Sequence, residues 1–273
     1  MTTHKSLIQI TEEDLKKIFV HYKKKKNDIW DIIWAFIKTT FFFAALFTFF
    51  FIAINFQAYY IKLNYFWNTV LFGKQPYQIV VNKPISSIEL KDIKNSKDDL
   101  QQKLLMDQFL LNYVSNNRLV IPSLNINTPI IWESSVENIL NDLKNGVVQY
   151  KGTALPGENG NVFITGHSSN YWWDDGKFKQ VFALLDNAQI GERIYLAYNN
   201  QPYVYLVEDT KVVSPSQIEV LNPLDHSIVT LMTCTPVGTT INRRIVQARQ
   251  IYPNPNLGEK KSAPALKTLP IIR

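Results

Sequence analysis

The 273-residue sequence predicts a mostly β-stranded domain that follows an N-terminal membrane-spanning helix. Two patterns lead to this prediction. Residues 39–61 carry no charged side chain, and residues 118–252 alternate short apolar runs with turn-forming residues. A composition of 46% hydrophobic and 19% charged residues excludes wholesale disorder and collagen-like repeats. The net charge of +6 is too small and too dispersed to favour nucleic acid as a partner.

The uncharged run over residues 39–61 is long enough to cross a lipid bilayer. At about 1.5 Å per helical residue it covers the roughly 30 Å hydrocarbon core. A buried core helix would show a polar face, and the apolar part of a cleaved signal peptide is shorter and ends at small residues. We therefore expect an uncleaved signal anchor.

Lysines around this run predict its orientation in the membrane. Residues 23–26 are four consecutive lysines, and Lys38 directly precedes the run, whereas lysines are sparse in the residues that follow it. The positive-inside rule places residues 1–38 in the cytoplasm as a basic tail, and residues 62–273 outside the cell.

Residues 62–117 have a mixed composition that is typical of a stalk. A helix is predicted over residues 97–114, because Ser96 and Asp99 resemble a capping box and apolar residues then recur at helical spacing. The helix either packs on the outer domain or holds it away from the membrane. At the other end of the chain, residues 253–273 contain several prolines and are expected to form a flexible tail.

The outer domain, residues 118–252, reads as an all-β barrel or sandwich. A short helix interrupts the strands, with Val136, Ile139, Leu140 and Leu143 as its apolar face and Gly146 at its end. The predicted strands are 118–121, 127–131, 162–165, 193–198, 203–208, 228–233 and 244–252.

Cys234 is the only cysteine, so the chain forms no internal disulfide and no cysteine-only zinc site. A lone cysteine is usually a small buried apolar residue. Here, however, Pro236 ends the strand at once, so that a loop can expose the thiol. An unpaired thiol outside the cell risks oxidation, and its retention hints at a use.

A thiol that attacks a carbonyl needs a base and a group that holds the developing oxyanion. His4 and His21 lie in the predicted cytoplasmic tail, which leaves His167 and His226. His167 directly follows a strand, whereas His226 sits in a polar turn and is expected to be solvated.

Two arginines open the strand that follows Cys234. Arg243 and Arg244 are adjacent, and alternate strand residues face opposite sides, so only one of them can point at the thiol. The other is expected to be a surface charge. The spacing alone favours neither.

These segments resemble the sortase family. Residues 230–234, Thr-Leu-Met-Thr-Cys, resemble the cysteine strand of sortases, and Arg243 stands where the family has its arginine. Residues 160–167, Gly-Asn-Val-Phe-Ile-Thr-Gly-His, resemble the segment that ends in the family's histidine. Further similarity follows in residues 182–195. The resemblance covers about residues 118–252.

The resemblance implies an eight-stranded β-barrel and a cysteine transpeptidase. Such an enzyme cleaves a C-terminal sorting signal of the Leu-Pro-x-Thr-Gly type and passes the acyl group to an amine of the cell wall or of a pilin. It implies no metal or organic cofactor. The implied catalytic residues are Cys234 as nucleophile, His167 as general acid and base, and Arg243 as oxyanion or substrate clamp; the implied substrate-binding residues are Thr165, Leu231 and Thr233.

Two other readings stay open. L,D-transpeptidases also use Cys, His and Arg, but this chain lacks a glycine before Cys234, and Arg243 is distant from the cysteine. A membrane-tethered β-barrel without activity, with a structural Cys234, is the non-enzymatic alternative. Within the sortases the subclass is open, because Thr235-Pro236 resembles pilus-assembling members whose C-terminal membrane span is not found here.

Overall fold

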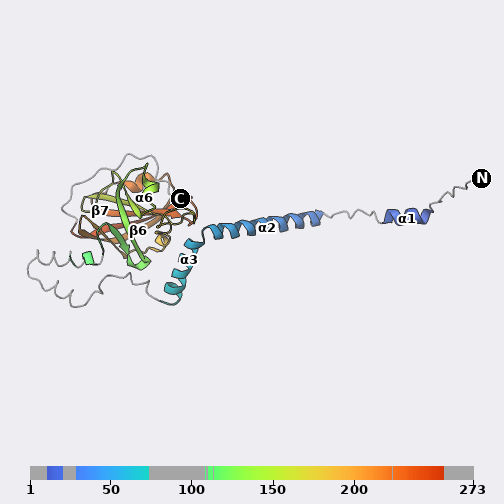
Figure 1. Ribbon diagram of the computed structural model, residues 1–273, viewed down its shortest axis with the longest axis horizontal. Helices are drawn as coiled ribbons and strands as arrows, with labels where there is room; N and C mark the ends of the chain where they lie inside the picture. The colour runs from blue at the N-terminus through green and yellow to red at the C-terminus, as the bar shows by residue number, and fades with distance from the viewer. Residues whose placement is uncertain are drawn as a thin grey trace, which may run out of the picture. The chain divides into compact units, whose positions relative to one another are not determined.

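The computed structural model describes residues 11–20, 29–73, 108, 110–112, 114–222 and 224–254. The chain divides into two compact units, Met1–Phe50 and Phe51–Arg273 (Figure 1). Most of the helix predicted over residues 97–114, the lysines at 23–26 and nearly all of the tail 253–273 lie outside the described residues.

The first unit contains α1, Glu12–Val20, and most of α2, Ile29–Ile54. Within the described residues, α2 is the one helix that is long and apolar enough to cross a membrane, and none of its residues is buried. Its two threonines, Thr39 and Thr48, donate their hydroxyl protons to carbonyl oxygens one turn earlier, each at 2.8 Å. Such bonds satisfy hydroxyl groups in an apolar surrounding.

The uncharged run does not form one continuous helix. α2 ends at Ile54, and a second helix, α3, spans Phe56–Tyr65 and continues into the π-helical turn η1, Phe66–Leu71. Ala58 of α3 is buried against Ala183 and Val237 of the barrel domain. Ala58 and Ile61, expected in the membrane, therefore contact the barrel domain, whereas Phe56 and Tyr60 of the same helix are exposed.

The second unit is a closed eight-stranded barrel, which confirms the predicted fold class. The strands follow one another around the barrel in the order β1-β2-β3-β4-β7-β8-β6-β5. Their bounds are β1 Arg118–Ile121, β2 Ile126–Ser134, β3 Val147–Tyr150, β4 Gly160–Thr165, β5 Arg193–Tyr198, β6 Gln201–Val213, β7 Ser227–Thr235 and β8 Asn242–Tyr252. Short helical turns connect them: η2 Pro122–Leu124, α6 Ile139–Asp142, η3 Leu185–Asn187 and η4 Ile218–Leu221.

Two local expectations need correction. Strand β3 was not among the predicted strands, because it has only four residues and follows directly on the predicted helix that ends at Gly146. The predicted helix at 136–143 is reduced to the four residues of α6. Of the four residues expected on its apolar face, Ile139 and Leu143 are buried, and Val136 and Leu140 are exposed. A single turn of helix has room for only part of an apolar stripe.

Strand β7 is buried on both faces, and this decides where Cys234 lies. Val229 and Leu231 point into the core that fills the barrel. Met232 and Cys234 alternate with them and belong to a second apolar cluster. Residues of η4 and of the end of β6 contribute to that cluster, so the thiol lies on the outer face of the barrel beneath the β6–β7 connection.

Candidate active site

The strand register aligns His167 with Cys234. β4 and β7 are parallel neighbours, with Thr165 opposite Met232, and each candidate follows two residues later. The alignment continues past the strand end, since the Gly166 amide donates to the Met232 carbonyl at 3.1 Å. Adjacent strands lie roughly 4.8 Å apart. The register therefore brings His167 and Cys234 to adjacent positions at this end of the β4–β7 pair.

Gly166 allows the backbone before His167 to pack closely against Phe182 and Val147. A Cβ atom at this position would lie 2.7 Å from Phe182 and 2.8 Å from Val147, so no larger residue fits without displacement. The Thr233 hydroxyl donates to the Gly166 carbonyl at 2.7 Å. The turn that carries His167 is thus held against the cysteine strand.

Arg243 lies directly opposite Cys234 in the antiparallel β7–β8 pair. Paired residues share a face of the sheet, so both side chains project to the outer face. The Arg243 side chain is 1% exposed, and its Nη1 donates to the Thr240 and Asn242 carbonyls at 2.9 and 3.1 Å. Its Nε is buried and has no hydrogen-bond partner among the described residues. One donor of a fixed guanidinium is therefore available.

Arg244 is not the solvated surface charge that the sequence suggested. Its Nε donates to Asp186 Oδ1 at 2.9 Å, and Lys62 of α3 binds the other oxygen of the same carboxylate at 2.7 Å. The Thr235 hydroxyl, next to Cys234, lies 3.2 Å from Asp186 Oδ1. Asp186 thus links α3, the cysteine strand and β8. Sequence reasoning missed it, and its one signal is a carboxylate at the end of the apolar run 181–185.

Burial raises the pKa of the Cys234 thiol, and the positive charge of Arg243 opposes this effect only in part. At neutral pH the resting thiol is therefore protonated. A base has to accept its proton when the sulfur attacks.

This balance predicts the pH dependence of Cys234 alkylation. The rate with a small haloacetamide is expected to rise with a midpoint above the ordinary thiol pKa of 9.0. In Arg243→Gln the midpoint should rise further, because burial stays while the cation that favours the thiolate is lost. Both midpoints are measured by quenching the alkylation at fixed times, from pH 6 to about 11, and determining the modified fraction by mass spectrometry. A lower midpoint in Arg243→Gln would contradict the charge assignment.

His226 lies at the N-terminal end of β7, opposite to the end that carries Cys234. It immediately precedes this strand, eight residues before Cys234, which corresponds to about 25 Å along an extended chain. Its side chain is exposed, and its Nδ1 lies 3.0 Å from an Asp225 carboxylate oxygen. His226 is therefore a surface residue, as expected. His4 and His21 lie outside the described residues.

The three expected substrate-binding residues are all buried. The Thr165 hydroxyl donates to the Met232 carbonyl at 3.2 Å, and that of Thr233 to Gly166. Leu231 is fully buried in the core of the barrel, where a peptide outside the barrel does not reach it. In this structure these residues hold β4 and β7 together.

The β7–β8 loop between Cys234 and Arg243 packs against the start of α3. A Cβ atom at Gly238, whose φ is +84°, would lie 2.7 Å from the Asn55 side chain. The Gly238 amide donates to Ser169 Oγ at 3.0 Å, and the Tyr59 hydroxyl donates to the Val237 carbonyl at 3.4 Å. The loop is thus held between α3 and the segment that follows His167, an arrangement that no sequence pattern indicated.

We expect Asp186→Asn to lower the free energy of unfolding by about 1.5–3 kcal/mol, the range for hydrogen bonds to charged groups. Burial raises the pKa of Asp186, but the hydrogen bonds and charges of Lys62 and Arg244 outweigh it and lower the pKa overall. The stabilisation is therefore present above the ordinary value of 3.8 and is lost as pH falls through the lowered pKa. Denaturant titration at pH 7 and pH 3 measures the difference.

Asp209→Asn is the matched control for this prediction. Asp209 forms an ion pair with Lys211 at 2.9 Å, but both side chains are far more exposed. Its loss is expected to cost at most about 0.5 kcal/mol. Equal effects of the two substitutions would show that the Asp186 pairs add no specific stability.

Comparison with known proteins identifies the family of the barrel domain. Residues 119–251 match the Sortase domain family. Sortase A of Bacillus anthracis is 25% identical over 175 residues, which are 64% of this chain and 72% of the relative. Sortase D of Bacillus subtilis (strain 168) is 26% identical over 138 residues, 49% of this chain and 62% of the relative.

Solved structures of sortases are also similar. That of a Clostridium perfringens Sortase D5 transpeptidase is 30% identical, covers 61% of this chain and 99% of the solved chain, and has a TM-score of 0.42. Clostridium perfringens sortase C, solved with the C-terminal cell wall sorting motif, is 28% identical over 60% of this chain and 96% of its own, with a TM-score of 0.42. The barrel domain, residues 119–251, belongs to the sortase family. Membership of this family implies transpeptidase activity.

Proposed function

We propose that the protein is a membrane-anchored cysteine transpeptidase whose reaction centre is formed by Cys234, His167 and Arg243. One observation carries this proposal: β4, β7 and β8 are neighbours, and their registers bring these three residues to the same end of the sheet. A base beside a thiol, with a fixed cation opposite, is the arrangement that nucleophilic acyl transfer requires.

In the first half of the proposed reaction, Cys234 Sγ attacks the carbonyl carbon of the scissile peptide bond. The imidazole of His167 accepts the thiol proton as the sulfur–carbon bond forms. The Arg243 guanidinium donates to the carbonyl oxygen as negative charge develops there. His167 then returns the proton to the leaving amine, the carbon–nitrogen bond breaks, and a thioester remains on Cys234.

In the second half, an acceptor amine attacks the thioester carbonyl. His167 takes the proton from the amine, Arg243 again holds the oxyanion, and the Cys234 thiolate leaves with the new amide complete. We propose a sorting signal of the Leu-Pro-x-Thr-Gly type as the acyl donor and an amine of peptidoglycan or of a pilin as the acceptor. Family membership supports both.

The test is incubation of the detergent-solubilised full chain with a library of sorting-signal peptides. The expected product is an acyl-enzyme whose added mass equals the peptide fragment before the scissile bond, located on Cys234 by proteolytic mapping. Adding a small amine should release it as the amide. A library that leaves no adduct on Cys234, with the protein folded, would refute the proposal and favour a non-enzymatic barrel.

We also propose that α2 anchors the protein with residues 1–38 in the cytoplasm and the barrel outside. Protease added to intact cells is expected to degrade the barrel domain and to spare the basic tail, because the lysines stay on the cytoplasmic side. Immunoblots against an N-terminal and a C-terminal tag read the result. A protected barrel domain in intact cells, degraded only after lysis, would overturn the orientation.

A further inference from the structure

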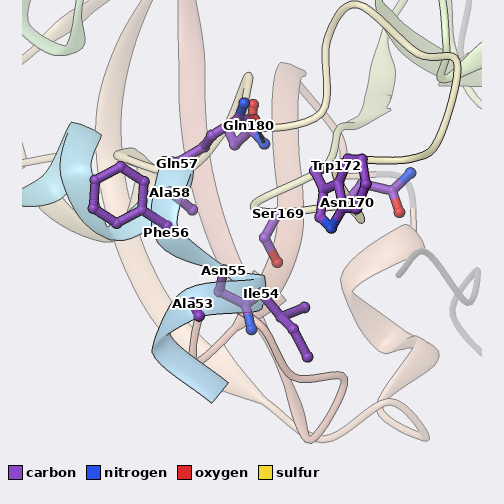
Figure 2. A pocket seen from close by; sticks show the side chains of 10 residues that line it. All are labelled: Ala53, Ile54, Asn55, Phe56, Gln57, Ala58, Ser169, Asn170, Trp172 and Gln180. Atoms are coloured by element: carbon purple, nitrogen blue, oxygen red, sulfur yellow. Dashed lines mark hydrogen bonds between the residues drawn. The ribbon is translucent and has the colours of Figure 1, made fainter. Parts of the chain in front are cut away.

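Exposed apolar side chains gather where α2 ends. Ile54 is the last residue of α2, and Phe56 and Trp172, which are 60% and 68% exposed, line one pocket with it. Figure 2 shows Phe56 and Trp172 on either side of this pocket, with Asn55 and Ser169 between them. The pocket therefore joins the end of the candidate membrane span to the loop that follows His167.

A second pocket extends this surface to the β7–β8 loop. It shares Asn55, Ser169 and Asn170 with the first and is also lined by Tyr171 and Ile241. Ile241 is 65% exposed and lies between Cys234 and Arg243 in the chain. We call Ile54, Phe56, Trp172 and Ile241 the apolar collar, since they line the two pockets that share Asn55.

The loop that carries Trp172 is held in shape by its own contacts. Tyr171 and Trp173 stack with ring centroids 4.5 Å apart, and Trp172 meets Trp173 edge to face at 5.6 Å. Lys179 Nζ donates to the Trp172 carbonyl at 3.0 Å. An ordered loop that keeps two tryptophans in solvent has an energetic cost, which a partner for these rings would offset.

Residues 171–179 contain two acidic and two basic side chains, and therefore carry no net charge. Aromatic rings on a neutral loop suit the headgroup region of a bilayer, where an apolar body and a polar N–H are both accommodated. A charged partner would need a complementary charge that this loop lacks. Continuity with the end of α2 identifies the bilayer that α2 spans as the nearest apolar medium.

We infer that Trp172 and Ile241 of the apolar collar, together with Trp173, insert into the headgroup region of the outer leaflet. This inference rests on the proposed membrane anchoring and deepens the proposed function. Trp172 follows His167 by five residues, and Ile241 precedes Arg243 by two. The reaction centre then opens at the membrane surface, where acyl donors and acceptors that are themselves held by the bilayer are within reach.

The chain's single cysteine makes a direct test possible. In a Cys234→Ala background, Trp172→Cys or Ile241→Cys is introduced into the full chain. The new cysteine is labelled with an environment-sensitive fluorophore, and the protein is reconstituted in phosphatidylcholine vesicles. Ile190→Cys is the matched control. Ile190 is 71% exposed, and Glu192, two residues on, interacts with Tyr65 at the far end of α3. Ile190 lines neither of the two pockets.

Lipids that bear a nitroxide near the headgroup are expected to cause a several-fold loss of emission at 172 and 241 and almost none at 190. Aqueous iodide should quench in the opposite order. Salt should change neither, because no net charge is involved. Vesicle flotation of each variant reports separately whether α2 anchors the chain.

Equal nitroxide quenching at 172 and 190 in chains that float would overturn the inference and leave the anchoring intact. Chains that do not float would refute the anchoring and the inference together. Emission at 172 that responds to a sorting-signal peptide, and not to nitroxide lipids, would make the loop a peptide-binding surface instead of a lipid-binding one.

Discussion

Replacement of Cys234 by alanine is expected to abolish acyl-enzyme formation and transpeptidation while the barrel stays folded. The chain has no other thiol, so no second nucleophile of this kind can replace it. The side chain is 2% exposed and packs among apolar residues, where alanine loses one sulfur atom and introduces no polar group. Mass spectrometry after incubation with a reactive sorting-signal peptide measures the adduct, and circular dichroism checks the fold.

The variants His167→Ala and His226→Ala test, in the same assay, which of the two histidines is the general acid and base. Loss of a general acid and base costs roughly 10²–10⁴ in rate. We expect this loss for His167, which the register aligns with Cys234, and near wild-type turnover for His226, at the other end of β7. Residual turnover in purified Cys234→Ala protein, or a dead His226→Ala variant with active His167→Ala, would refute the proposed centre.

Two residues of the proposed reaction centre could be selected from the sequence because they occupy local patterns, whereas Arg243 was chosen over Arg244 only through the family resemblance. Cys234 stands at the end of an apolar run that Pro236 closes, and His167 follows Gly166 at the end of another. Residues at strand ends lie at the rim of a barrel, so both patterns place these two residues at the rim. What the sequence alone does not contain is that these two strands are parallel neighbours, which is a property of the barrel order.

The surroundings of the centre were not predictable, because they depend on contacts between distant segments. Residues 56–61 carry no charge and therefore read as part of the membrane helix, and only the barrel surface around Ala183 shows why α3 packs there. Asp186 is one carboxylate among many in the sequence. Its ion pair with Lys62 joins segments that are more than a hundred residues apart in the chain. Its second ion pair, with Arg244, adds strand β8 to the same contact. Hydrophobic periodicity does not distinguish a lipid partner from a protein partner.

Alanine substitutions of the two adjacent arginines are expected to have different effects, one on turnover and the other on stability. Arg243→Ala should lose roughly 10²–10³ in kcat, the usual cost of removing one donor to a developing oxyanion. Arg243 lies opposite Cys234, is held by the Thr240 and Asn242 carbonyls, and keeps a buried Nε without a partner among the described residues. Lysine at this position should rescue poorly, because an ammonium group lacks the planar fork of the guanidinium.

Arg244→Ala should instead keep kcat within severalfold of wild type and lower the melting temperature. Its side chain projects to the opposite face of β8 and binds Asp186, so its loss removes an ion pair and leaves the donor at Cys234 in place. Steady-state turnover well below the melting temperature, and thermal unfolding on the same samples, separate the two effects. If Arg244→Ala is inactive while folded and Arg243→Ala turns over normally, the oxyanion role belongs to Arg244. The reaction centre then has to open on the face of β8 that carries Asp186.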